Sequence, residues 1–457
     1  MNPLARLRST LAGPFAPRAL FALALACVVF LGWSRASFRE ARGDEGTFLA
    51  MTRSLVRDAD LAFDARDLAR AEATEPRPSL ILQRSGGGVA YSKPVLYPLW
   101  SAPFVALFGP WGMLVANVAA LVAALALARA ALVARFGAAD AEWLLFTFAG
   151  AGVLPAFAGW RMTEALQLAL ALAAVALTLL PPGDGKGIAR AGAPLVGGLL
   201  AGLLVSLREP NALVAAAIVA GAWVGGGRRR ALRVAAGAAA GYLLALALTW
   251  GLTGAANPYK APRSSFDATT GYPVGESAER ALARFGDDDA LATSSLGALP
   301  DDFDLRRSGY SALYFLVGRH SGALAYFPGA MLLFLVALAR PRARAAVAVG
   351  GFAALALFYL VWIPSNYFGG ETFLANRYAL AGLPLALAAV SRPVRRRTLA
   401  VAWLVAAVAA GSAIASVVFV APFDRSIHSH VHAGLFRALP YESNASHLEG
   451  RTDRYWS

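Results

Sequence analysis

Residues able to do acid–base chemistry stand in the first polar loop of the sequence, directly after an apolar block. Asp44 and Glu45 begin a segment in which Phe48, Met51 and Leu55 recur at helical spacing, so a helix lying on a membrane surface is expected here. A carboxylate at its start suits a general base. It equally suits an N-cap that accepts hydrogen bonds from free backbone N–H groups.

Basic side chains at the edges of apolar blocks suit the binding of a phosphate group. Lys93 lies between Tyr91 and Tyr97 in a proline-containing stretch where the chain re-enters an apolar block. Its alternative role is to extend its ammonium toward lipid headgroups. Arg161 and Glu164 are three residues apart, hence on one helix face, where they form either an ion pair or part of a site.

Two later turns carry further candidates. Arg208 and Asn211 belong to an Arg-Glu-Pro-Asn turn between two apolar blocks. A Gly-Gly loop ending in Glu371 precedes Arg377 and Tyr378 at the start of an apolar block. A guanidinium drawn inward there needs a partner, which is either a phosphate or the carboxylate of Glu371.

The composition excludes a soluble globular protein. Of the 457 residues, 58% are hydrophobic and 15% charged, and mean hydropathy is +0.53, whereas soluble domains carry about 25% charged residues. The net charge is +14, but the arginines cluster in short loops between apolar blocks. That distribution is typical of membrane orientation and argues against a nucleic-acid partner.

Blocks of about 20 apolar residues predict membrane-spanning helices. Eleven are expected, at Ala19–Ser37, Trp111–Val133, Ala141–Gly159, Ala165–Leu180, Ala193–Leu207, Ala212–Gly225, Leu232–Leu252, Ala323–Leu338, Ala345–Ile363, Tyr378–Val390 and Leu399–Ala421. The shorter, proline-interrupted Pro94–Phe108 suits a half-buried helix. The first block favours a retained anchor over a cleaved signal peptide, because it is long and lacks an obvious cleavage site.

The distribution of arginine predicts the orientation. With the N-terminus in the cytoplasm, the cytoplasmic loops are rich in arginine, and almost all acidic residues fall on the other side. The C-terminus and the polar loops 38–93, 257–319 and 364–377 are then outside. We therefore expect one transmembrane domain, residues 1–421, followed by a short extracytoplasmic tail, residues 422–457.

The Asp-Glu pair, the surface helix, the Lys-Pro-x-x-Tyr-Pro stretch and the Arg-Tyr helix start resemble motifs of the GT-C integral-membrane glycosyltransferases. Similar members include the protein O-mannosyltransferases and the aminoarabinose transferases that act on lipid A. The resemblance extends over residues 19–390. It implies an all-α polytopic membrane protein with about 11 transmembrane helices and interfacial helices in the first outer loop.

The resemblance also implies the reaction: transfer of a sugar, with inversion, from a polyprenyl-phosphate donor to an extracytoplasmic cell-envelope glycan, lipid or protein. Asp44 and Glu45 are the expected catalytic residues. The expected phosphate ligands are Lys93, Arg377, Arg161 and Arg208, and the expected sugar or acceptor contacts are Tyr91, Tyr97, Glu164, Asn211, Glu371 and Tyr378.

No metal site is expected and no cofactor is required, with a divalent cation left as an option. The expected location is the bacterial inner membrane, with membrane lipids as further partners. The main alternative is a polytopic transporter or flippase. It is disfavoured because the ionisable residues gather at the outer rim and leave the spans bare.

Overall fold

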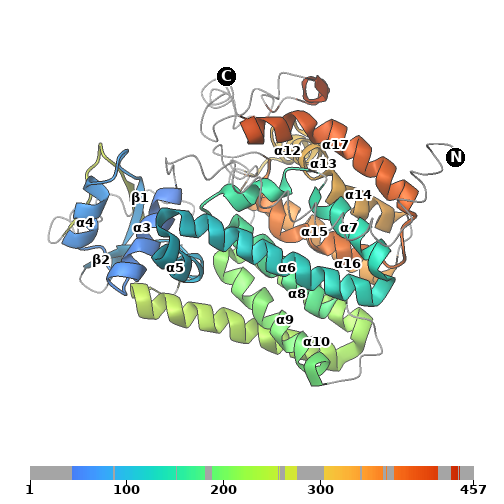
Figure 1. The fold of residues 1–457 in the computed structure, drawn as a ribbon, viewed down its shortest axis with the longest axis horizontal. Helices are drawn as coiled ribbons and strands as arrows, with labels where there is room; N and C mark the ends of the chain where they lie inside the picture. The colour runs from blue at the N-terminus through green and yellow to red at the C-terminus, as the bar shows by residue number, and fades with distance from the viewer. Residues whose placement is uncertain are drawn as a thin grey trace.

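The structure, a computed structural model, describes residues 44–85, 88–150, 152–180, 188–255, 257, 263–274, 303–339, 342–363, 367, 375–419, 434–440 and 442. The predicted first span, Ala19–Ser37, and the predicted site residue Glu371 lie outside these residues. Within them the protein is a bundle of helices with a small mixed helix-and-sheet unit at one end (Figure 1).

The apolar blocks form the helices of the bundle. In the first half these are α5 (Leu96–Phe108), η1 (Gly109–Trp111), α6 (Gly112–Phe136), α7 (Ala138–Gly150), η2 (Leu154–Gly159), α8 (Glu164–Thr178), α9 (Ile188–Leu207), η3 (Glu209–Asn211) and α10 (Ala212–Thr253). In the second half they are α12 (Leu305–Val317), α13 (Ala323–Tyr326), α14 (Pro328–Leu338), α15 (Ala343–Trp362), η6 (Arg377–Gly382), α16 (Leu385–Ala389) and α17 (Arg396–Phe419).

Within the described residues, three helical stretches are long and apolar enough to cross a membrane, namely 96–136, 209–253 and 343–362, and four shorter apolar helices accompany them. Two predicted spans, Ala212–Gly225 and Leu232–Leu252, are the two arms of α10, which bends at Gly227. Gly227 has φ 74°, a conformation that residues with a Cβ rarely adopt. The predicted span Ala141–Gly159 is instead α7 followed by the 3₁₀ helix η2.

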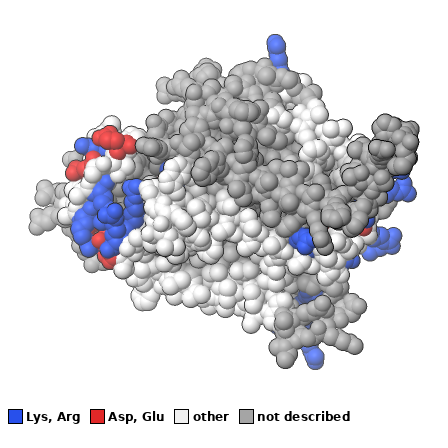
Figure 2. All heavy atoms as spheres, in the orientation of Figure 1, with Lys and Arg blue, Asp and Glu red and all other residues white. Residues whose placement is uncertain are grey.

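The outer surface of the bundle suits lipid. Trp223 and Trp250 of α10 are each 65% exposed, and a large exposed apolar surface of this kind needs an apolar medium to cover it. On the face drawn in Figure 2, the described charged side chains gather toward the ends of the molecule and leave uncharged surface between them. The protein is a multi-pass membrane protein, as predicted.

Helices α9 and α10 pack with their backbones in contact. Gly198 and Gly202 of α9 face Gly237 and Gly241 of α10, and a Cβ built on any of the four would lie 2.0–2.2 Å from a carbonyl oxygen of the other helix. Both pairs have the small-x-x-x-small spacing that lets membrane helices approach closely. Only glycine fits at these four positions.

We expect Gly241→Val to lower the free energy of unfolding by about 1–3 kcal/mol, because the added methyl groups overpack the α9–α10 contact. Gly251→Val is the matched control, since a Cβ there meets no atom within 4 Å. Thermal unfolding of the two variants in the same detergent measures the difference. Equal midpoints would contradict the close packing.

The first outer loop folds into a unit that includes a sheet not predicted from the sequence. It contains α3 (Asp44–Arg57), α4 (Ala65–Glu72), β1 (Leu80–Ser85) and β2 (Gly88–Tyr91). The sheet order is β2-β1-β3, all antiparallel, and β3 (Arg263–Phe266) comes from the second outer loop. The sheet therefore joins two loops that are far apart in the sequence at one end of the bundle (Figure 1).

The short tail packs on the bundle. Within the described residues it contains η8 (Gly434–Ala438), and the carboxylate of Glu442 accepts hydrogen bonds from the backbone N–H groups of His320 (2.9 Å) and Ser321 (3.1 Å). The His320 Nδ1 atom lies 2.8 Å from the same carboxylate. These contacts attach the tail to the turn before α13.

Candidate functional site

An ion pair joins two residues that the sequence analysis placed in the site. Asp44 is the first residue of α3, and Lys93 lies between β2 and α5. The Lys93 Nζ atom is 2.8 Å from Asp44 Oδ2, and the side chains are 8% and 29% exposed, respectively. The carboxylate is therefore partly accessible, while the ammonium is buried.

The charges around this pair determine its protonation. Burial by itself would raise the pKa of Asp44, but the positive charges of Lys93, Arg377 and Arg208 outweigh it and hold the pKa below its ordinary value of 3.8. Burial lowers the pKa of Lys93 from 10.5, although Asp44 opposes this shift. At neutral pH Asp44 is therefore an ionised carboxylate able to accept a proton.

A buried carboxylate holds the two predicted arginines close together. Glu164 begins α8, Arg208 follows α9 and Arg377 begins η6. Glu164 Oε1 lies 3.1 Å from Arg208 Nη2 and 3.4 Å from Arg377 Nη1. Since one carboxylate faces two guanidinium groups, the cluster retains positive charge beside Asp44.

Two polar atoms of this cluster remain available to a ligand. Glu164 Oε2 and Arg377 Nε are buried, and neither has a hydrogen-bond partner among the described residues. A buried polar atom without a partner costs free energy. A substrate that donates to the glutamate oxygen and accepts from the arginine N–H would remove that cost.

Aromatic rings frame the guanidinium groups. Arg208 lies over the ring of Tyr378 at 4.3 Å, and Arg377 lies over the ring of Trp160 at 5.2 Å. Tyr378 in turn stacks on Tyr359 of α15, with ring centroids 4.2 Å apart. These contacts orient both arginines through cation–π attraction.

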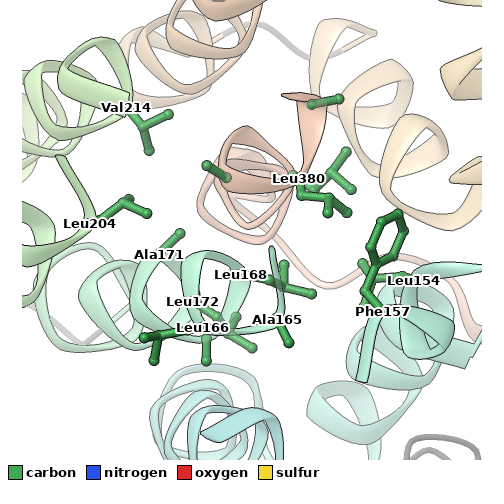
Figure 3. Close-up of a cluster of buried hydrophobic side chains, with 14 of the residues drawn as sticks. Leu154, Phe157, Ala165, Leu166, Leu168, Ala171, Leu172, Leu204, Val214 and Leu380 are labelled. Atoms are coloured by element: carbon green, nitrogen blue, oxygen red, sulfur yellow. The ribbon is translucent and has the colours of Figure 1, made fainter. Parts of the chain in front are cut away.

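The apolar core explains why these elements meet. Side chains of η2, α8, α9 and η6 form one buried cluster, including Leu168, Leu204 and Leu380 (Figure 3). Their packing holds the start of η6 against α8, so that Arg377 reaches Glu164. The buried amide of Asn117 in α6 also holds these segments together, because its Nδ2 atom donates to the carbonyl of Trp160 at 2.6 Å.

Glu45, the acidic neighbour of Asp44, lies in a different environment from Asp44. Glu45 is 3% exposed, and its Oε1 accepts a hydrogen bond from the backbone N–H of Arg161 at 3.1 Å. Glu45 therefore ties α3 to the segment before α8. Arg161 itself lines a cavity formed with the opposite side of α3.

Three other predicted residues lie in packed surroundings. The Tyr91 hydroxyl donates to Asp67 Oδ1 at 2.9 Å, and the fully buried Tyr97 packs edge-on against Phe48. The Asn211 amide donates to Gln167 Oε1 at 2.9 Å. In this conformation these side chains support the helices around the site.

The sequence analysis missed several contributors. Trp160 is the first residue of the stretch that contains Arg161 and Glu164, and its aromatic type was a usable signal. Asn117 was visible as a polar residue inside an apolar block. No signal pointed to Arg263, whose charge acts on Lys93, because β3 comes from the second outer loop. Within the described residues, no group of three His, Cys, Asp or Glu side chains could hold a metal ion.

Comparison with known proteins identifies the fold. No family profile and no curated protein sequence matches this chain. The crystal structure of ArnT from Cupriavidus metallidurans bound to undecaprenyl phosphate matches 88% of this chain and 65% of that one, at 17% identity and a TM-score of 0.53. The chain has the GT-C fold.

A second solved structure is similar to this chain at a lower TM-score. The Archaeoglobus fulgidus oligosaccharyltransferase in its apo form, also a GT-C protein, matches 90% of this chain and 56% of that one, at 13% identity and a TM-score of 0.49. The chain spans about two thirds of the length of the ArnT structure that it matches.

Proposed function

We propose that this GT-C protein transfers a sugar, with inversion, from a polyprenyl-phosphate donor to a hydroxyl of an extracytoplasmic acceptor. The observation that carries the proposal is the Asp44–Lys93 pair: an ionised, partly exposed carboxylate bound to a buried ammonium at 2.8 Å. Arg208 and Arg377 lie close enough to lower the pKa of that carboxylate. A proton acceptor and three cationic side chains therefore lie close together.

Each group has a role in a single displacement. Asp44 accepts the proton of the acceptor hydroxyl as its oxygen attacks the anomeric carbon. The bond between that carbon and the phosphate oxygen breaks, and its electron pair leaves with the polyprenyl phosphate. Lys93, Arg208 and Arg377 stabilise the charge that develops there. No metal ion is required, because these cations supply the stabilisation.

The available polar atoms suit the substrates. Arg377 Nε supports phosphate binding because it has no acceptor among the described residues, and Glu164 Oε2 is free to accept from a sugar hydroxyl. Tyr378 and Trp160 offer ring faces beside them. Support for a lipid donor comes from the ArnT structure, which has the same fold and was crystallised with undecaprenyl phosphate.

We propose that the protein lies in a bacterial cytoplasmic membrane with this site outside. The bend of α10, which carries Arg228, Arg229 and Arg230, is on the opposite side of the bundle from α3 and the sheet (Figure 1). Short arginine-rich loops stay in the cytoplasm. The end with Asp44 then faces the periplasm or cell exterior, where the donor lipid can reach it from the outer leaflet.

Purified protein in lipid nanodiscs, supplied with a panel of polyprenyl-phosphate sugars, tests the proposal. Release of free polyprenyl phosphate, in EDTA as well as with Mg²⁺, is the expected result. Binding of a donor without release, after addition of envelope extract as the source of acceptor, would contradict a transferase. Movement of the donor across the bilayer without cleavage would establish the transporter alternative.

The pH profile gives a second test, because Lys93 must be protonated to hold the phosphate. Its pKa lies below 10.5 and that of Asp44 below 3.8, so activity should be level through neutral pH and fall on the alkaline side before pH 10.5. Lys93→Arg keeps its charge at high pH, so its alkaline limb should move upward. Identical alkaline limbs in the two proteins would exclude Lys93 as the titrating group.

A further inference from the structure

The opposite face of α3 forms a cavity of about 300 Å³ that the proposed reaction does not use. Its wall on α3 consists of residues with i, i+3, i+4 and i+7 spacing, namely Gly46, Leu49, Ala50 and Arg53. Asp44 and Arg53 are nine residues apart, about two and a half helical turns. They therefore lie on opposite sides of α3, and the cavity is separate from the Asp44 cluster.

The wall of the cavity carries three arginines, Arg53, Arg70 and Arg161, and two acidic residues, Asp67 and Glu75. Arg70 is already paired with Asp67 at 2.6 Å and with Asp58, and Asp67 also accepts from the Tyr91 hydroxyl. Arg53 lines the same cavity. Burial lowers the pKa of Arg53, and the positive charges of Arg57, Arg161 and Arg70 lower it further.

The residues that line the cavity, and their position relative to the membrane, indicate which ligand it could bind. Pro110 and Trp111 form part of its wall, and Trp111, 43% exposed, stands where the apolar α6 begins. Tryptophan at such a position is typical of the membrane–water interface. On the face drawn in Figure 2, Lys and Arg side chains gather over the α3–α4 end. An anion here would lie at headgroup depth.

We propose that this cavity is a second anion site, which binds a phosphate ester through Arg53 and Arg161. Guanidinium groups bind phosphate oxygens through paired N–H donors, and the neighbouring proline and tryptophan surfaces suit the organic part of the ester. The proposal concerns binding alone and does not depend on the transferase activity. The ester comes either from a membrane lipid headgroup or from a soluble sugar or glycerol phosphate.

Arg161 connects this site to the candidate active site. Its backbone N–H donates to Glu45, the residue next to Asp44. A phosphate ester held by Arg161 would therefore lie near the start of α3, which carries the proton acceptor.

Titration of full-length protein in neutral detergent with glycerol 3-phosphate, followed by calorimetry, tests the site. The measurement uses the Arg377→Gln background, so that the Asp44 cluster contributes little binding. In that background Arg53→Gln should weaken binding by about tenfold or more, since it removes a charge-assisted contact. Ala50→Phe, which fills the cavity without changing its charge, should have a similar effect.

Arg57→Gln is the matched control, because Arg57 is an exposed arginine on the same helix and does not line the cavity. Equal losses in the Arg53 and Arg57 variants would overturn the proposal in favour of diffuse surface charge. A second arm uses nanodiscs with and without phosphatidic acid. Retention of phosphatidic acid that depends on Arg53, without binding of glycerol 3-phosphate, would identify a lipid headgroup. Absence of binding in both arms would also overturn it.

Discussion

Replacing Asp44 by asparagine should lower kcat for sugar transfer by about 10²–10⁴-fold, the usual contribution of a general base. The amide has nearly the same shape as the carboxylate but accepts no proton from the acceptor hydroxyl. Lys93 would lose its counter-ion, yet the ammonium would still face the donor phosphate. The expected loss is therefore in kcat, measured as release of polyprenyl phosphate, with donor binding retained.

Asp60→Asn is the control for this variant, since Asp60 lies in the same outer loop and its side chain is 40% exposed. That variant should keep the activity of the unchanged protein. Thermal unfolding should show that both variants are folded. Full turnover by the Asp44 variant would exclude it as the proton acceptor.

Replacing Arg377 by glutamine should raise the KM for the donor by about 10- to 100-fold, because a charge-assisted hydrogen bond to phosphate contributes about 1.5–3 kcal/mol. Glu164 would keep its contact with Arg208 at 3.1 Å, so the buried carboxylate would still have a cationic partner. The KM for the acceptor should change little. Steady-state kinetics with each substrate varied in turn separates the two effects.

Arg392→Gln controls for the loss of one positive charge, since Arg392 is exposed and lies between α16 and α17. Arg377→Lys should restore only part of the donor affinity, because an ammonium lacks the planar paired donors of a guanidinium. Equal rises in both KM values for Arg377→Gln would indicate that Arg377 supports the fold of η6 rather than the donor phosphate.

Most of the helices could be predicted from the sequence. Apolar blocks of membrane-spanning length require backbone hydrogen bonds within the segment, so a helix follows from composition alone. The exceptions have local causes. Gly227 bends α10 between two predicted spans, and Pro155 lies at the start of η2, where the predicted span ends as a 3₁₀ helix.

The site was predicted in part. Asp44, Lys93, Glu164, Arg208 and Arg377 were each named from local motifs, and the structure brings them into neighbouring ion pairs. Their roles stay predictions. The pairing expected as an alternative for Arg377, with Glu371, falls outside the described residues, and Arg377 pairs with Glu164 across 213 positions of sequence.

The sequence by itself determined that this protein enters a membrane, where its helices lie and which residue types stand at the rim. These properties depend on hydrophobicity and charge, which each segment carries locally. Only the tertiary structure decided which acid meets which cation, that β3 completes the sheet of the first outer loop, and that the face of α3 opposite Asp44 lines a cavity with arginines. Those features depend on contacts between segments far apart in the chain, and packing of the helices is what brings them together.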